Sequence, residues 1–222
     1  MRPIRLVLEI RHSQVPELFL NKEKIFLAIT GQESPINSFN GEGIRVHIKK
    51  KKMFVVVEPG RTGVLTEELS NEKNSKDLIY QIFSKLNEHL SWKKIDRVGI
   101  RSFWIHPTEE NFDNFVQIFK DVFFNTSNDV LNESKDVGSF LTLYDGNNRV
   151  NFISGPMEKA QLLNEYMTYK DGTFPDRFVF VDIDYSITNT SFSDALVKDS
   201  LDKAMGYSRS KSSQVEQLFK KK

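Results

Sequence analysis

The chain has 222 residues, of which 39% are hydrophobic and 27% charged, so it can bury a core beneath a solvated surface. Its 31 lysines and arginines nearly balance its 30 aspartates and glutamates, which leaves no overall field to attract nucleic acid or an anionic membrane. The absence of cysteine excludes disulfides, thiolate nucleophiles and cysteine-bound metals. Because there is neither a signal-peptide pattern nor a run of about 18 apolar residues, we expect a cytoplasmic protein with no membrane contact.

The N-terminal half reads as strands with one short and one long helix. Alternating apolar and polar side chains predict strands, and apolar residues three or four apart predict helices. In chain order we expect a strand over 4–10, a short helix over 15–19, a strand over 25–29, and a hairpin of strands over 43–49 and 53–58. A loop from Pro59 to about Asn74 follows, and then an amphipathic helix over 75–90.

The C-terminal half begins with the best-patterned helix of the chain. A strand over 95–105 leads into it, Thr108 is the expected cap, and one helical face carries Phe112, Phe115, Phe119 and Phe123. These four side chains are expected in the core. The remaining expectations are a linker over 125–136, a hairpin of 140–144 and 149–153, a helical or irregular segment over 157–169, a strand over 177–187, and a helix from Ser193 broken at Gly206.

These elements predict an α+β fold. Strand and helix signals occur in both halves, and the length permits one or two small lobes. The expected lobe boundary lies in the polar segment over 125–136 or at Pro107, and we divide the chain into lobes over 1–107 and 108–222, the second with a helical tail.

The most enzyme-like feature is the pair Asp182 and Asp184. Residues two apart on a strand point to one face, so their carboxylates could share a divalent metal in a nuclease or hydrolase. Such a site needs further carboxylates, histidines or a lysine, and none stands at a telling spacing. We expect a solvated or structural pair, with no metal and no cofactor bound.

A second candidate is the basic turn of the first hairpin. Arg45 leads into Lys49, Lys50, Lys51 and Lys52, a concentration of positive charge that could contact phosphates. The alternative is a solvated hairpin tip whose lysines deter edge pairing. Because no aromatic residue is interleaved with these lysines, we treat nucleic-acid contact as the secondary interpretation.

The third candidate is the C-terminal tail. Val215, Leu218 and Phe219 stand at i, i+3 and i+4, the stripe of a short amphipathic helix. A helix of about eleven residues is unstable alone in water, so this stripe must pack on its own lobe or on a protein partner. A polar segment over 207–213 would let it reach a partner.

Two short motifs resemble an uncharacterised, sporadically distributed family of prokaryotic proteins. Its members have a strand reading Arg-Ile-Gly-Leu-Arg and a late strand with an LDID-like core. Here Arg97–Arg101 (RVGIR) match the first and Val181–Asp184 (VDID) match the second, whereas 102–104 depart from the family pattern. The resemblance implies two small α+β lobes, each an antiparallel sheet with packed helices. It carries no assigned activity and implies an occurrence similar to that of mobile or antiviral-defence genes.

The same motifs have a physical interpretation. Gly99 in mid-strand marks a bulge or a close backbone approach. Arg97 and Arg101 flank it on one face and would need carboxylate partners if partly buried. Asp182 and Asp184 are the candidates, and such pairing would make both motifs structural.

We therefore expect a non-enzymatic, protein-binding or regulatory subunit of a multi-protein prokaryotic system, such as one of antiviral defence, that acts with an ATPase or nuclease. The alternatives are a metal-dependent nuclease or hydrolase centred on Asp182 and Asp184, and a nucleic-acid sensor using the Lys49–Lys52 turn.

Overall fold

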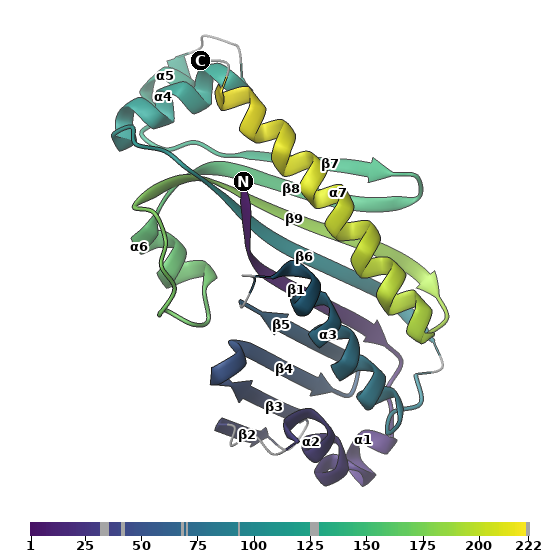
Figure 1. Cartoon of the computed structure of the whole chain (residues 1–222). Helices are drawn as coiled ribbons and strands as arrows, with labels where there is room; N and C mark the ends of the chain where they lie inside the picture. Colours follow the sequence, from purple (N-terminus) through teal and green to yellow (C-terminus); the bar gives the residue numbers. More distant parts are fainter. Residues whose placement is uncertain are drawn as a thin grey trace.

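A single antiparallel sheet dominates the protein (Figure 1). The computed structural model describes residues 1–31, 36–40, 43–67, 69, 71–92, 94–124 and 129–220. The sheet has nine strands in the order β2-β3-β4-β5-β1-β6-β9-β8-β7. In chain order these are β1 (Arg2–His12), β2 (Ile36–Asn40), β3 (Gly43–Ile48), β4 (Met53–Glu58), β5 (Arg61–Thr66), β6 (Ile95–Pro107), β7 (Ser139–Asp145), β8 (Asn148–Glu158) and β9 (Arg177–Thr190).

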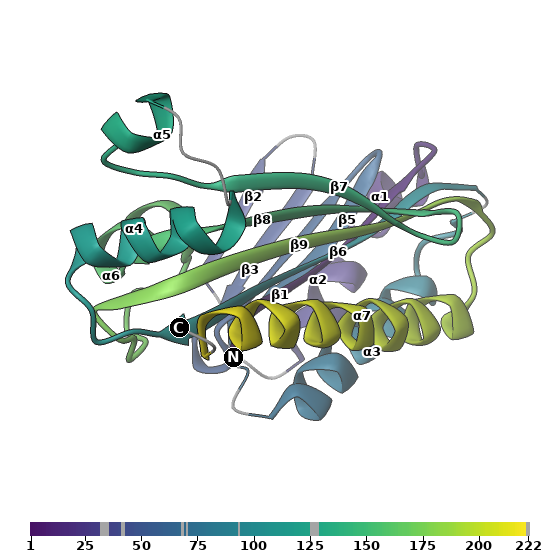
Figure 2. The same cartoon turned by 90° about the horizontal axis from the view of Figure 1, so that it is seen from above.

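Helices pack against the sheet and confirm the α+β class. The α-helices are α1 (Glu17–Leu20), α2 (Lys22–Thr30), α3 (Glu72–Asn87), α4 (Phe112–Phe123), α5 (Asp129–Glu133), α6 (Lys159–Gln161) and α7 (Asp194–Lys220). A 3₁₀ turn, η1 (Lys49–Lys51), and a single π-turn, η2 (Leu162–Tyr166), complete the described elements. Figures 1 and 2 show α3 and α7 side by side along one face of the sheet.

The two separate sheets expected from the sequence are one continuous sheet. β6 pairs with β1 on one side and with β9 on the other, so Pro107 lies at the end of a central strand. A division at that residue would separate β6 from β9, whose ladder runs from Ile95 paired with Thr190 to Pro107 paired with Phe178. A repeating strand pattern identifies strands but does not say which strands share a sheet, because pairing depends on residues far apart in the chain.

The larger part of the core lies between the sheet and α2, α3, α4 and α7. On β1, Leu6, Leu8 and Ile10 are fully buried beneath these helices, and they alternate with Arg5, Val7, Glu9 and Arg11 on the other face. The helix α4 contributes Phe115 and Phe119, both buried, as its spacing predicts. Phe123 is partly buried against the same cluster.

Among the described residues, the cover of the second face of the sheet lies at one end. There Leu162 of η2 and Met167 pack on Phe103 and Phe180 in a smaller apolar cluster. Beyond this cluster the second face carries charged and polar side chains together with apolar ones such as Val7, Phe54 and Val56, and we call it the open face. Its residues come from β3, β4, β5, β1, β6, β9, β8 and β7.

Three predicted elements are corrected. Residues 25–29 belong to helix α2 rather than a strand, and the expected loop after Pro59 contains strand β5, whose Gly63 weakens the alternating pattern. The expected break at Gly206 does not occur, because α7 continues through that residue to Lys220. No described helix is both long and apolar enough to cross a membrane.

Candidate ligand-binding face

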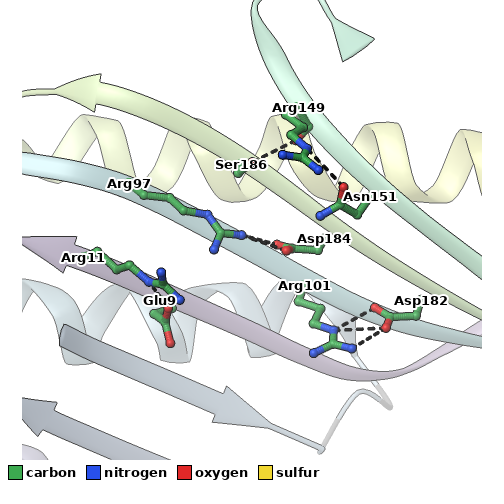
Figure 3. A network of polar contacts seen from close by, with 9 residues as sticks. All are labelled: Glu9, Arg11, Arg97, Arg101, Arg149, Asn151, Asp182, Asp184 and Ser186. Atoms are coloured by element: carbon green, nitrogen blue, oxygen red, sulfur yellow. Dashed lines mark hydrogen bonds and ion pairs between the residues drawn. The ribbon is translucent and has the colours of Figure 1, made fainter. Parts of the chain in front are cut away.

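Two arginine–carboxylate pairs join the central strands of the open face (Figure 3). Arg101 of β6 donates from Nε and Nη2 to the carboxylate of Asp182 on β9, at 2.5 to 3.1 Å. Arg97 donates from Nη2 to both oxygens of Asp184, at 2.8 and 2.7 Å. The pairing considered from the sequence is thus present, and each aspartate faces a guanidinium.

The two pairs differ in burial. The side chain of Asp182 is 3% exposed, whereas that of Arg101 is 46% exposed. Burial raises the pKa of Asp182, and the hydrogen bonds from Arg101 oppose that rise. The same hydrogen bonds raise the pKa of Arg101, so the ion pair favours both charged forms. In the second pair, the side chains of Arg97 and Asp184 are almost equally exposed.

Gly99 does not mark a bulge. Its missing side chain leaves room for a guanidinium group. A Cβ on Gly99 would lie 3.3 Å from Nη2 and 3.4 Å from Cζ of Arg97, so this guanidinium lies over the glycine backbone. Glu9 of β1 is paired across the strands with Gly99 on one side and Gly63 on the other. The space above Gly63 is taken by Val56 of β4, whose Cγ1 would lie 3.2 Å from a Cβ on that glycine.

A second group of charges centres on Glu58 of β4. Its carboxylate accepts hydrogen bonds from Arg45 of β3 at 2.7 Å and from Arg61 of β5 at 2.8 Å. Burial alone would raise the pKa of Glu58, but these two arginines together hold it below its ordinary value. Arg61 also lies 3.7 Å from Glu9, and Arg11 donates to Glu9 at 3.0 Å. The charges of four strands are thereby connected.

These residues surround a cavity of about 530 Å³ on the open face. Among its lining residues are six arginines and two carboxylates: Arg5, Arg11, Arg45, Arg61, Arg97, Arg101, Glu9 and Asp184. Three further carboxylates bind these arginines from outside the cavity lining: Glu58, Glu67 and Asp182. The positive and negative charges of this face are therefore nearly balanced. The charges are nevertheless separated by depth.

In most of these pairs the guanidinium faces solvent and the carboxylate lies beneath it. The side-chain exposures are 46% against 3% for Arg101 and Asp182, 44% against 21% for Arg45 and Glu58, and 57% against 25% for Arg11 and Glu9. A carboxylate fixed below a guanidinium orients it without occupying its outer donors, and arginine forks match phosphate and carboxylate groups. The surface is therefore suited to an anionic ligand.

The basic residues singled out from the sequence do not form one surface. Arg45 belongs to the open face, whereas Lys50 and Lys51 line a different pocket together with Asn71 and Ser75 at the start of α3. Lys52, in a left-handed conformation with φ of 43°, lies 3.1 Å from Asp171. Lys49 lies in the η1 turn and is exposed. The residues of this candidate site therefore lie on different faces of the sheet and do not form one binding surface.

The tail residues pack against their own chain. Val215 is 5% exposed, and the Phe219 ring lies about 6 Å from those of Phe115, Phe119 and Phe123. The supposed flexible segment over 207–213 is helical. Of the three partner-binding candidates, only Leu218 is exposed, at 43%.

Both aspartates considered as metal ligands are bound by arginines. Arg97 and Arg101 hold the aspartates that a metal would need, and within the described residues no group of three or more histidines and carboxylates is placed to bind one. Sequence reasoning missed Arg5, Arg11, Arg61 and Glu9 as members of this face. The available signal was the alternation of β1, which places arginines and a glutamate opposite its buried leucines.

Comparison with known proteins assigns no family. No family model matches the chain, and no curated protein matches its sequence. One solved structure similar to it is described as Methanococcus jannaschii TBP, with 9% identity and a TM-score of 0.32 over 91% of this chain and 98% of that one. A similarity at this level carries no functional argument.

Proposed function

We propose that the chain is a non-enzymatic binding subunit whose open face binds the phosphate backbone of nucleic acid. The observation that supports this proposal is a difference in burial: the guanidinium groups are exposed, and the carboxylates that bind them lie beneath. Arg45, Arg61, Arg11 and the β6 arginines are held in place by their carboxylates before a ligand arrives. Binding therefore costs less side-chain entropy than ordering free lysines would.

The length of the arginine-bearing surface favours a polymer over a single nucleotide. Arginines occur on this face from Arg45 on β3 to Arg149 on β8, which lies beyond the cavity and bonds to Asn151, and these strands are six positions apart in the sheet. At about 4.8 Å per strand, this distance is about 29 Å. A nucleic acid strand rises about 3.4 Å per nucleotide, so roughly eight nucleotides would cover it.

The hydrolase alternative requires a rearrangement that the binding proposal does not. A metal between Asp182 and Asp184 would have to displace Arg97 and Arg101, leaving two guanidinium groups beside the cation. Binding at the outer donors leaves both pairs intact. The geometry therefore favours recognition over hydrolysis.

Fluorescence anisotropy with labelled single-stranded DNA, single-stranded RNA and duplex DNA tests the proposal. Arg45→Gln/Arg61→Gln should raise the Kd about tenfold and lower the slope of log affinity against log salt by about two. The matched control is Lys73→Gln/Lys198→Gln, which removes two charges from exposed positions on α3 and α7. Absence of saturable binding, or equal loss in both double variants, would refute the proposal.

The wider role remains part of the same proposal. A multi-protein prokaryotic system, with an ATPase or nuclease partner and a place in antiviral defence, follows from the family resemblance. Affinity purification from the native host, with and without nuclease treatment, separates the two kinds of contact. A protein that co-purifies after nuclease treatment supports a direct partner, whereas recovery of nucleic acid alone would remove the partner from the proposal.

A further inference from the structure

Strand β7 is an outer strand of the sheet, and its register determines which backbone groups are unpaired. β7 and β8 form a hairpin in which Asp145 pairs with Asn148 around Gly146, whose φ is +59°. In a two-residue hairpin the flanking pair is hydrogen-bonded, and such pairs then alternate along the strands. Ser139, Leu141, Leu143 and Asp145 therefore bond to β8.

The alternate residues point their backbone groups away from the sheet. The N–H and C=O groups of Phe140, Thr142 and Tyr144 face outward, and no hydrogen bond from another described residue reaches them. In Figure 2, which looks onto this edge, no helix lies across β7, and α5 lies to one side of its beginning. The edge is open to another strand.

This edge lacks the features that usually prevent pairing. Edge strands are normally protected by lysine, proline, a bulge or a covering element. The sequence of β7, SFLTLYD, contains no lysine or proline, and its register with β8 is regular. The exposed fractions are 63% for Phe140, 46% for Leu141 and 70% for Tyr144.

The pattern of β7 is complementary to itself. In an antiparallel register centred on Thr142, each Phe140 faces the Tyr144 of a second copy, and each Leu141 faces a Leu143. Thr142 faces its own copy. The outward-facing residues 140, 142 and 144 then pair only with one another, so every free donor meets a free acceptor. A register shifted by one residue would pair outward groups with inward ones.

We propose that two copies of this chain pair through β7 and join their sheets into one. Cross-strand aromatic pairs stabilise such an edge, and both open faces would lie on the same side because the two-fold axis is perpendicular to the sheet. The edge of β7 is separate from the arginine pairs, so this pairing of two copies does not depend on nucleic-acid binding.

Sedimentation of the full chain and of charge variants tests the pairing. Thr142→Lys and Thr142→Glu each place like charges opposite each other across the axis, so each should shift the species from twice the 25.8 kDa chain mass to once that mass. Mixing the two variants should restore the dimer, which also shows that both are folded. Gln217→Lys and Gln217→Glu, at an exposed position on α7, are matched controls and should remain dimeric.

Cysteine crosslinking tests the register. The chain has no cysteine, so Thr142→Cys provides one thiol per copy. Hydrogen-bonded antiparallel partners have Cα atoms about 5.5 Å apart, within disulfide range, and mild oxidation should give a covalent dimer. Phe140→Cys should not crosslink, because the axis places the two copies of that residue four positions apart along the strands.

Each outcome decides the proposal. A wild-type chain that remains monomeric up to hundreds of micromolar overturns it, as does a dimer that Thr142→Lys leaves unchanged. Crosslinking of Phe140→Cys as readily as Thr142→Cys overturns the register.

Discussion

Arg101 and Asp182 lie 81 residues apart in the chain, yet three hydrogen bonds join the guanidinium to the carboxylate across two neighbouring strands. The carboxylate is almost inaccessible to water, and the guanidinium is half exposed. The aspartate therefore depends on the arginine for its charge compensation, while the arginine has an outer side that remains available.

Removal of Arg101 should destabilise the fold more than removal of Arg97. Arg101→Ala leaves a buried carboxylate unpaired and should cost about 2 to 3 kcal/mol, less than for a fully buried pair because the arginine is partly solvated. Arg97→Ala should cost about 1 kcal/mol, because Asp184 can be hydrated. Urea unfolding measures both. Arg101→Met/Asp182→Leu should recover most of the loss, and a double variant as unstable as Arg101→Ala would contradict the explanation.

The aromatic cluster between α4 and α7 should account for a large part of the stability. Phe115 is 1% exposed, so Phe115→Ala should lower the free energy of unfolding by about 3 to 5 kcal/mol through a cavity. Phe19, which is 55% exposed on α1, provides the control, and Phe19→Ala should change it by less than about 1 kcal/mol. Equal effects of the two substitutions in thermal unfolding would place α4 outside the core.

Gly206 should be replaceable by alanine with a gain in stability. It lies inside α7, and a Cβ there meets no atom within 4 Å. Gly206→Ala should add about 1 kcal/mol, because alanine loses less backbone entropy in a helix. Gly31, with φ of +58°, is the contrasting position, and Gly31→Ala should lower the melting temperature. A lower melting temperature for Gly206→Ala would indicate that the helix is interrupted there.

Glu216 should make stability depend on pH in acid. Hydrogen bonds from Lys220 and from the amino group of Met1 lower its pKa from 4.5 to about 2. A carboxylate with a lowered pKa in the folded state stabilises the fold above its ordinary pKa, and this contribution is lost as pH falls from about 4.5 towards 2. Urea midpoints across this range should therefore fall less steeply for Glu216→Gln.

A control for the acid titration is Glu133→Gln on α5, which makes the same change in charge but removes none of the described ion pairs. Its urea midpoints should follow those of the wild-type chain throughout the acid range. Identical curves for all three proteins would show that the contacts of Glu216 do not contribute to stability.

Local sequence patterns predict those helices and strands that bury one face against a single layer of the fold. The phenylalanine spacing of α4 and the alternation of β1 were sufficient, because each buries one face against one layer. Gly206 was misread because a glycine tolerated in a packed helix has the same local signal as one that ends it. Gly63 hides β5 in a similar way, since it breaks the alternating pattern while Val56 of β4 fills the space of its missing side chain.

The candidate site was only partly predictable. The two aspartates and the arginines around Gly99 could be paired from their alternation alone. Arg45 and Arg61 could not be added, because their common partner Glu58 brings β3, β4 and β5 together only once the strand order is known. The sequence also does not predict how deeply each aspartate side chain is buried, since nothing in the local pattern distinguishes Asp182 from Asp184.

The central place of β6 has a consequence during synthesis. β1 leaves the ribosome before β6, so that strand has no neighbour on one side until residues 95–107 emerge. β6 itself then waits for residues 177–190 before its second edge is covered. A nascent chain that ends before β9 leaves an edge of β6 unpaired, and the core side chains Val98, Ile100 and Trp104 lack the cover of α7, so such a chain is prone to intermolecular association. The N-terminal half is thus the part of this protein that would most need a chaperone while translation is still in progress.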